Sequence, residues 1–179
     1  ADAVQTVLDA PMTPVTGAFS ARKIAFELPL TEKQPLEVYR AESEGDSLAA
    51  FAARWYVAHY DELPASKTYT MQRIDLGDTL TLIGMEGEVV VEYEYHMRLL
   101  LPGRKVVTLG YSNGNPGYIC TAEMYRYGGY EPEGSTVCYN LREGWKPEAE
   151  SVILENAKRL LIFAPDAPSW NRISSEWGQ

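Results

Sequence analysis

Two oxygen-bearing side chains, Glu88 and Tyr118, occupy the positions at which this sequence most suggests chemistry. Each directly follows a glycine, Gly87 or Gly117, and each lies shortly after a segment with the composition of a buried strand. Loops at strand ends are where α/β proteins place ligands, and glycine lets a backbone approach a ligand closely. Because a carboxylate and a phenol both suit a hard or borderline cation, the pair suggests a metal site.

Each of the two residues also has a purely structural interpretation. We expect Glu88 at the first turn of a helix, where free N–H groups and the helix dipole favour an anion, and it could simply complement that dipole. Tyr118 could simply pack on the core, in a chain with 12 tyrosines. A phenol binds zinc well only if the metal lowers its pKa.

Other catalytic patterns are absent from the sequence. It has no Gly-x-Ser-x-Gly elbow, no His-Glu-x-x-His motif, no phosphate loop and no dinucleotide fingerprint. The two histidines, His59 and His96, are expected to be packed or at the surface, because no second ligand lies at a useful spacing.

An ordered set of short motifs resembles the C-terminal part of the catalytic region in neutral, non-lysosomal ceramidases, which are zinc amidases. It includes the twelve-residue step from Tyr118 to Tyr130 and spans roughly residues 1–135. The motifs are Gly87 with Glu88, Asn113 with Gly114, Gly117 with Tyr118, Thr121, and Gly129 with Tyr130 and Glu131.

The resemblance implies a role for four of these residues. Glu88 and Tyr118 would be two of four zinc ligands, beside two histidines. Tyr130 would donate its hydroxyl to the substrate amide or its tetrahedral oxyanion, and Asn113 would contact the substrate. The substrate implied is a ceramide-like N-acyl amide. The chain departs from many relatives at Asn115, Pro116 and Cys120, which we interpret as changes in the lining of the pocket.

The resemblance also implies that this chain is incomplete as an enzyme. The family's histidine ligands and serine nucleophile would come from the N-terminal part of the same parent protein. Residues 1–179 would then be a single domain, the C-terminal portion of a larger catalytic region, binding zinc weakly and inactive alone. The family is secreted or periplasmic, which would allow a disulfide.

Bulk properties narrow the class of protein. The length of 179 residues suits one domain, and an apolar fraction of 45% can build a core. The net charge of -9 disfavours nucleic acid as a partner, and no apolar run is long enough to span a membrane. Cys120 and Cys138 permit one disulfide, or are two buried thiols.

Periodicity predicts an α/β fold, with α+β possible, containing a mixed sheet and flanking helices. Strands are expected at 23–30 and 106–111, and 67–75 and 79–85 form a hairpin. Residues 31–45 look like an exposed connection. A helix capped by Asp46 or Ser47 has an apolar face that includes Leu48, Phe51, Ala52, Trp55, Tyr56 and His59. A long Gly- and Tyr-rich loop at 112–146, with a short helix at 121–127 capped by Thr121, precedes a helix at 148–163.

The segment 89–101 is ambiguous. Its alternation of apolar and polar residues is typical of a strand, whereas Val89, Tyr93, Met97 and Leu100 also fit one helical stripe. Its thirteen residues exceed the usual strand length. The resemblance implies a helix, and we choose it. Together with its neighbours it makes a strand–helix–strand unit with parallel strands.

Two other functions remain open. The Tyr- and Gly-rich loop could belong to a non-enzymatic domain that binds a carbohydrate or a protein, because aromatic loops do this readily. The chain could also be a relative that kept the fold and lost the chemistry. Zinc content of the parent protein separates the enzyme from the binding domain.

Overall fold

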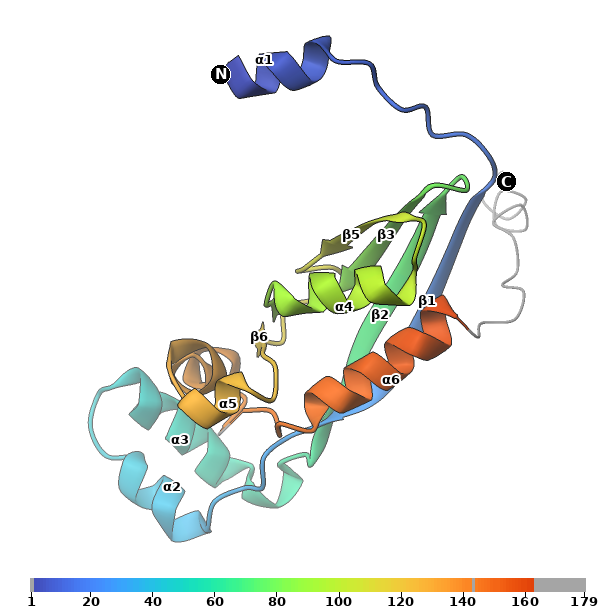
Figure 1. Ribbon diagram of the computed structural model, residues 1–179. Helices are drawn as coiled ribbons and strands as arrows, with labels where there is room; N and C mark the ends of the chain where they lie inside the picture. Colours follow the sequence, from blue (N-terminus) through green and yellow to red (C-terminus); the bar gives the residue numbers. More distant parts are fainter. Residues whose placement is uncertain (1, 143, 163–179) are drawn as a thin grey trace, which may run out of the picture.

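A four-stranded mixed sheet forms the centre of the protein (Figure 1), of which the computed structural model describes residues 2–142 and 144–162. Its strands run in the order β1 (Phe19–Pro29), β2 (Ser66–Leu76), β3 (Leu80–Met85) and β5 (Lys105–Leu109). β2 is antiparallel to β1 and β3, whereas β5 is parallel to β3. The α/β class, the hairpin and the parallel pair are thereby confirmed.

The remaining elements are helices and one short parallel ladder. The ladder consists of β4 (Glu88–Val89) and β6 (Tyr118–Ile119). The α-helices are α1 (Asp2–Asp9), α2 (Leu36–Glu42), α3 (Leu48–Ala58), α4 (Glu92–Leu100), α5 (Met124–Tyr127) and α6 (Ala149–Leu161). Shorter turns are the 3-10 helices η1 (Tyr60–Glu62) and η3 (Thr136–Tyr139) and a π-helix, η2 (Tyr130–Gly134). None of the helices within the described residues has the length and apolarity needed to cross a membrane.

The ambiguous segment is a helix, α4, and its burial shows why. Tyr93 and Met97, one turn apart, are fully buried, whereas Tyr95 and Leu99 are 58% and 79% exposed. A strand would have placed Tyr93, Tyr95 and Met97 on one face. Because β3 and β5 are parallel, they need a crossover connection, and α4 lies between them in the chain.

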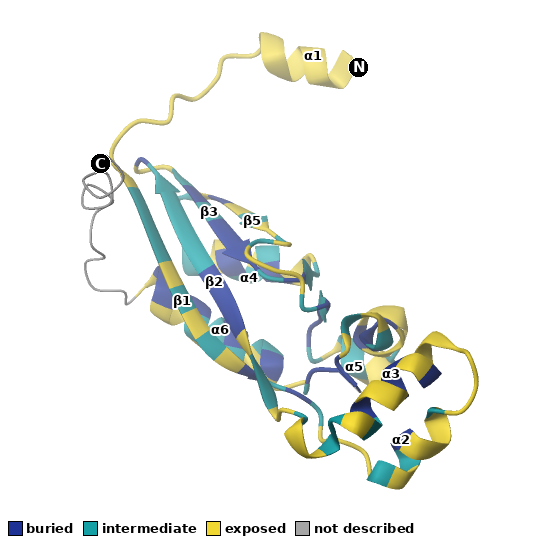
Figure 2. Ribbon diagram, turned by 180° about the vertical axis from the view of Figure 1, so that it is seen from behind, coloured by how far each residue is buried: buried dark blue, intermediate teal, exposed yellow. Residues whose placement is uncertain are grey.

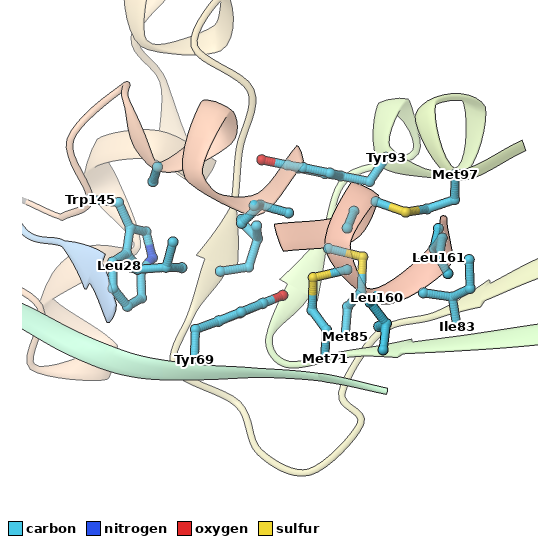
Figure 3. Close-up of a cluster of buried hydrophobic side chains, with 14 of the residues drawn as sticks. Leu28, Tyr69, Met71, Ile83, Met85, Tyr93, Met97, Trp145, Leu160 and Leu161 are labelled. Carbon is cyan, nitrogen blue, oxygen red and sulfur yellow. The ribbon is translucent and has the colours of Figure 1, made fainter. Parts of the chain in front are cut away.

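The hydrophobic core lies between one face of the sheet and the helices α4 and α6 (Figure 3). β2 and β3 contribute Tyr69, Met71, Ile83 and Met85, and α6 contributes Leu160 among others. Each of these large side chains is at least 99% buried. Fully burying one such apolar side chain stabilises a fold by about 1.5–3 kcal/mol.

The opposite face of the sheet is not covered by any helix among the described residues (Figure 2). Side chains alternate between the two faces of a strand, so Ile74, Leu82 and Val107 point away from the core. These three residues are register partners across β2, β3 and β5, and Val107 is 41% exposed. The sheet therefore presents an apolar row on the side away from α4 and α6.

Two expectations for the N-terminal half are wrong. The connection at 31–45 contains a helix, α2, whose Tyr39 packs on Tyr56 with ring centroids 5.2 Å apart. Ser47 caps α3 as expected, by accepting a hydrogen bond from Ala50 N–H. The predicted apolar face of α3 is only partly right: the buried side chains are Ala50, Ala52, Ala53 and Tyr56, and the main neighbours of the helix are α2 and η3. Leu48, Phe51 and Trp55 are instead exposed, at 56%, 67% and 42%.

Near the turn between β2 and β3, a network of charged and polar side chains surrounds Asp75. This carboxylate contacts Arg73 at 2.9 Å and Arg104 at 3.1 Å, and accepts a hydrogen bond from Thr81 Oγ1 at 2.7 Å. Arg73 also donates to the Leu161 carbonyl at the end of α6. Burial alone would raise the pKa of Asp75, but the hydrogen bonds from Thr81 and Arg73 and the two cations outweigh burial and lower that pKa.

We expect Asp75→Asn to lower the free energy of unfolding at neutral pH by about 2 kcal/mol, because hydrogen bonds to charged groups contribute ~1.5–3 kcal/mol. The folded pKa lies below the unfolded value, so this stabilisation is complete above the unfolded pKa and is lost as pH falls through the folded pKa. Urea denaturation should therefore show the gap between wild type and variant narrowing below about pH 4. The same substitution at exposed Asp61 is the control. An equal loss at both positions would contradict the prediction.

Candidate functional site

The short parallel ladder sets Glu88 and Tyr118 side by side. The two are register partners, and Glu88 N–H donates to the Gly117 carbonyl at 2.9 Å. Val90 N–H continues the ladder by donating to the Ile119 carbonyl. The expectation that Glu88 begins a helix is wrong, since α4 starts at Glu92. Backbone pairing with β6, rather than a helix dipole, places this carboxylate.

Two glycines make the close approach of β4 and β6 possible. Gly87 has φ of +82°, and a Cβ there would stand 2.5 Å from the Gly117 carbonyl oxygen. Gly117 has φ of +110°, and a Cβ there would lie 3.1 Å from the Tyr139 ring and 2.9 Å from Leu141. A side chain at Gly87 would push the two backbones apart, and one at Gly117 would displace Tyr139 and Leu141, so glycine precedes both candidate residues for a steric reason.

Tyrosine hydroxyls surround the Glu88 carboxylate. Tyr111 donates to Oε2 at 2.7 Å, and Tyr139 donates to Oε1. The bonds from Tyr139 and Tyr111 lower the pKa of Glu88, against a smaller opposing effect of burial, and a bond from Tyr118 adds a little. The group is therefore an ionised carboxylate near neutral pH, held by neutral donors.

Tyr118 is a neutral phenol in this arrangement. Its hydrogen bond to Glu88, then burial and the charge of that carboxylate, raise the pKa of Tyr118 to about 12. A nearby cation acts in the opposite direction, because a metal lowers the pKa of the donors that it binds. The neighbouring Glu88 carboxylate is therefore the main reason why Tyr118 would need a metal ion to lose its proton and become a good ligand.

Tyr130 lies beside Tyr118, with ring centroids 6.0 Å apart and ring planes 76° from parallel. Tyr130 is 59% exposed, at the start of the π-helix η2. A cleft of about 450 Å³ opens next to the pair, and Glu88, Tyr111, Tyr118 and Glu131 are among its lining residues. The carboxylate and the phenols therefore face a space that can hold a ligand.

Asn113 and Asn115 belong to the loop that leads to Tyr118. Asn113 is exposed in a left-handed conformation, with φ of +73°. Asn115 accepts a hydrogen bond from Gly117 N–H and also contacts the Tyr139 hydroxyl. The expected contact of Asn113 with the substrate remains a prediction. Asn115, which was expected to alter the lining of the pocket, stabilises the turn before Tyr118.

The other sequence candidates lie apart from this cluster. His59 stacks on Trp55 at the end of α3, and His96 lies 3.6 Å from Glu150. Cys120 is a buried free thiol and Cys138 an exposed one, so neither open interpretation of the cysteines holds in full. Thr121 does not cap α5 with its side chain, although its carbonyl accepts from Met124 N–H.

Two tyrosines at the site, Tyr111 and Tyr139, were not predicted from the sequence. Tyr111 follows β5, and Tyr139 ends η3, 51 residues along the chain from Glu88. The one local signal was the glycine before Tyr111, which resembles the glycines before Glu88 and Tyr118. Nothing adjacent to Tyr139 in the sequence distinguishes it from the other tyrosines.

The donor set fits half of a zinc site. One carboxylate and one phenol converge on the cleft, and both are acceptable oxygen ligands. Within residues 2–142 and 144–162, no three His, Cys, Asp or Glu side chains group closely enough to hold a metal ion. Zinc sites usually have at least three protein ligands, so the remaining ligands would have to come from elsewhere.

One solved structure with a related fold is neutral ceramidase from Pseudomonas aeruginosa. The match covers 87% of this chain with a TM-score of 0.52 and 18% sequence identity. At that identity the likeness establishes a shared fold, which confirms the resemblance suggested by the motifs. The match covers only 30% of the ceramidase chain. No family model and no curated protein matches the sequence.

We expect Gly117→Ala to lower the free energy of unfolding by about 2 kcal/mol or more, because it combines an unfavourable φ with a steric clash. Gly103→Ala is the matched control: its φ is +87°, and a Cβ there meets nothing within 4 Å. The control should cost about 1 kcal/mol, the conformational part alone.

Urea denaturation measures both variants, and hydrogen exchange of the Glu88 amide, which bonds to Gly117, reports local opening. If Gly117→Ala is no more destabilising than Gly103→Ala and leaves exchange of the Glu88 amide unchanged, then the close packing of Tyr139 and Leu141 against Gly117 does not require glycine.

Proposed function

We propose that this chain is the C-terminal portion of a ceramidase-like zinc amidohydrolase acting on N-acyl, ceramide-like lipid amides. The observation that carries the proposal is the Glu88 carboxylate held beside Tyr118 at a cleft, on a fold shared with neutral ceramidase. Glu88 and Tyr118 would hold the zinc ion. When bound, zinc would polarise the amide carbonyl or activate a nucleophile.

The rest of the parent protein, on this proposal, supplies the histidine ligands and the serine nucleophile. Two properties of the chain support such a partner. The match spans 30% of the ceramidase chain, and the four-stranded sheet has an apolar row through Ile74, Leu82 and Val107 on its uncovered face. Residues 1–179 would then act as one unit of a larger catalytic region, in a secreted or periplasmic protein.

Tyr130 would contribute directly to catalysis. Its ring lies edge-on to Tyr118, so its hydroxyl can reach a substrate bound next to the proposed metal ligands. A phenol O–H that donates to the developing oxyanion stabilises the transition state more than the neutral amide. Asn113, exposed on the loop before Tyr118, would orient the substrate amide or its hydroxyl groups.

We expect Glu88→Gln to abolish stoichiometric zinc binding by the parent protein, because it removes the only charged donor of the pair. Glu86→Gln, two residues away, is the matched control and should retain the metal. Metal analysis after purification under zinc-replete conditions is the measurement, with circular dichroism to verify folding. Full zinc content in a folded Glu88→Gln protein would overturn the proposed ligand.

Tyr130→Phe should lower kcat for hydrolysis of an N-acyl sphingosine by about 10²–10³-fold, the usual cost of removing one oxyanion donor. Zinc content should not change, since Tyr130 is not a proposed ligand. Tyr127→Phe is the control, because Tyr127 is 81% exposed and three residues away. Unchanged kcat in Tyr130→Phe would exclude the oxyanion role.

A second candidate is a non-enzymatic domain that binds a carbohydrate or a protein. The exposure of Tyr111, Tyr127 and Tyr130, at 62%, 81% and 59%, favours it, because aromatic side chains are common in such surfaces. A parent protein without zinc under zinc-replete conditions, and without amidase activity, would support this candidate over the enzyme.

A further inference from the structure

Both oxygens of the Glu88 carboxylate are held by side chains from distant parts of the chain. Tyr139, at the end of η3, donates to Oε1, and Tyr111, just after β5, donates to Oε2 at 2.7 Å. A carboxylate has about four lone-pair sites, of which Tyr139, Tyr111 and the smaller bond from Tyr118 use three, so one site stays open and a second is released when Tyr118 binds the cation itself. The two phenols therefore fix the orientation of Glu88 without closing it to a cation.

The backbone at Tyr111 is in a conformation that few side chains adopt. Tyr111 has φ of +55°, and its N–H donates to the Gly87 carbonyl at 2.8 Å. A left-handed conformation is unfavourable for a bulky residue and persists only where the surroundings impose it. Tyr111 is also 62% exposed, so burial of its ring does not account for the conformation. The segment is held instead by the backbone bonds of Tyr111 N–H to Gly87 and of Ser112 N–H to Met85, together with the bond from the Tyr111 hydroxyl to Glu88.

Tyr139 reaches the same carboxylate through close packing. Its ring lies against Gly117, where a Cβ would come within 3.1 Å of it, and Asn115 contacts its hydroxyl. The residue after it, Asn140, is left-handed at φ of +55°. Gly117 thus serves two purposes: its carbonyl accepts the ladder hydrogen bond from Glu88 N–H, and its lack of a side chain leaves room for the Tyr139 ring.

We propose that Tyr111 and Tyr139 are positioning residues that clamp the Glu88 carboxylate, leaving Tyr118 as the phenol that binds the cation directly. The inference rests on the proposed function for the identity of the cation, but the clamp itself is a property of this chain. Hydrogen bonds from surrounding side chains orient metal ligands, and their loss typically weakens metal binding by ~10–100-fold.

The affinity of the parent protein for zinc tests the clamp. It can be measured by competition with a chromophoric chelator, with zinc as the added ligand and no substrate present. Tyr139→Phe and Tyr111→Phe should each weaken zinc binding by roughly 10–100-fold. Tyr127→Phe should leave the zinc affinity unchanged, because Tyr127 is 81% exposed and is not among the hydrogen-bond donors to Glu88. Near-ultraviolet difference spectra should show a tyrosinate signal on zinc addition that persists in both clamp variants and disappears in Tyr118→Phe.

Unchanged zinc affinity in both clamp variants would overturn the proposal. So would loss of the tyrosinate signal in Tyr139→Phe or Tyr111→Phe, because the residue would then be a ligand rather than a positioning group. Melting temperatures of the metal-free variants show whether any loss of affinity reflects unfolding.

A metal-free measurement separates failure of the clamp from failure of the proposed function. In the 179-residue chain labelled with ¹³C at glutamate, the Glu88 side-chain carboxyl resonance can be assigned with Glu88→Gln. Its chemical shift should move in Tyr139→Phe and Tyr111→Phe and stay fixed in Tyr127→Phe. If the shift moves as expected but the parent binds no zinc, the clamp stands and the zinc amidase does not. If it does not move, the clamp is wrong.

Discussion

The close contact between the backbones at Gly87 and Gly117 is the constraint on which the candidate site depends. A Cβ at Gly87 would stand 2.5 Å from the Gly117 carbonyl oxygen, so the ladder that pairs Glu88 with Tyr118 requires glycine at position 87. The ladder is two residues long on each side, too short to be stable by itself. It is stabilised because only Glu86 and Gly87 separate β4 from β3, because Ile119 is buried in the core, and because the Tyr69 hydroxyl donates to the Glu86 carbonyl.

The electrostatics of the site follow from this geometry. Glu88 is ionised because phenol hydroxyls stabilise it, with no lysine or arginine among the causes of its lowered pKa. Among the described residues, no cationic side chain contributes to this lowered pKa, so none of them neutralises the Glu88 charge, in a chain whose net charge is -9. Neutral donors can orient a carboxylate and leave its charge available, which an ion pair would not do. Such a site attracts a cation more strongly than one closed by arginine.

The sequence could predict the parts of the fold that have a strong local pattern. The β2–β3 hairpin, the helix α6 and the Ser47 cap follow from periodicity and turn residues. Only the family resemblance predicted α4 as a helix, because Tyr95 and Leu99 are apolar residues on its exposed face and give the segment the alternating pattern of a strand. α2 was missed because its only buried side chain, Tyr39, finds its partners on α3 and η1. Tyr139 could not have been found, since no spacing links it to Glu88, and the glycine before Tyr111 was too weak a signal to single that residue out.

The same reasoning explains why the described residues bring together only part of a candidate metal site. A compact cluster of one carboxylate and its phenols can form on a strand end, where glycines bring two segments together. A full metal site needs further nitrogen or oxygen donors, and the described histidines are committed elsewhere, His59 to Trp55 and His96 to Glu150. A second feature is the apolar row through Ile74, Leu82 and Val107, which no helix among the described residues covers: Val107 is 41% exposed, and Ile74 and Leu82 are partly exposed. One additional layer of protein would bury that row, and the same layer is where the missing ligands could come from.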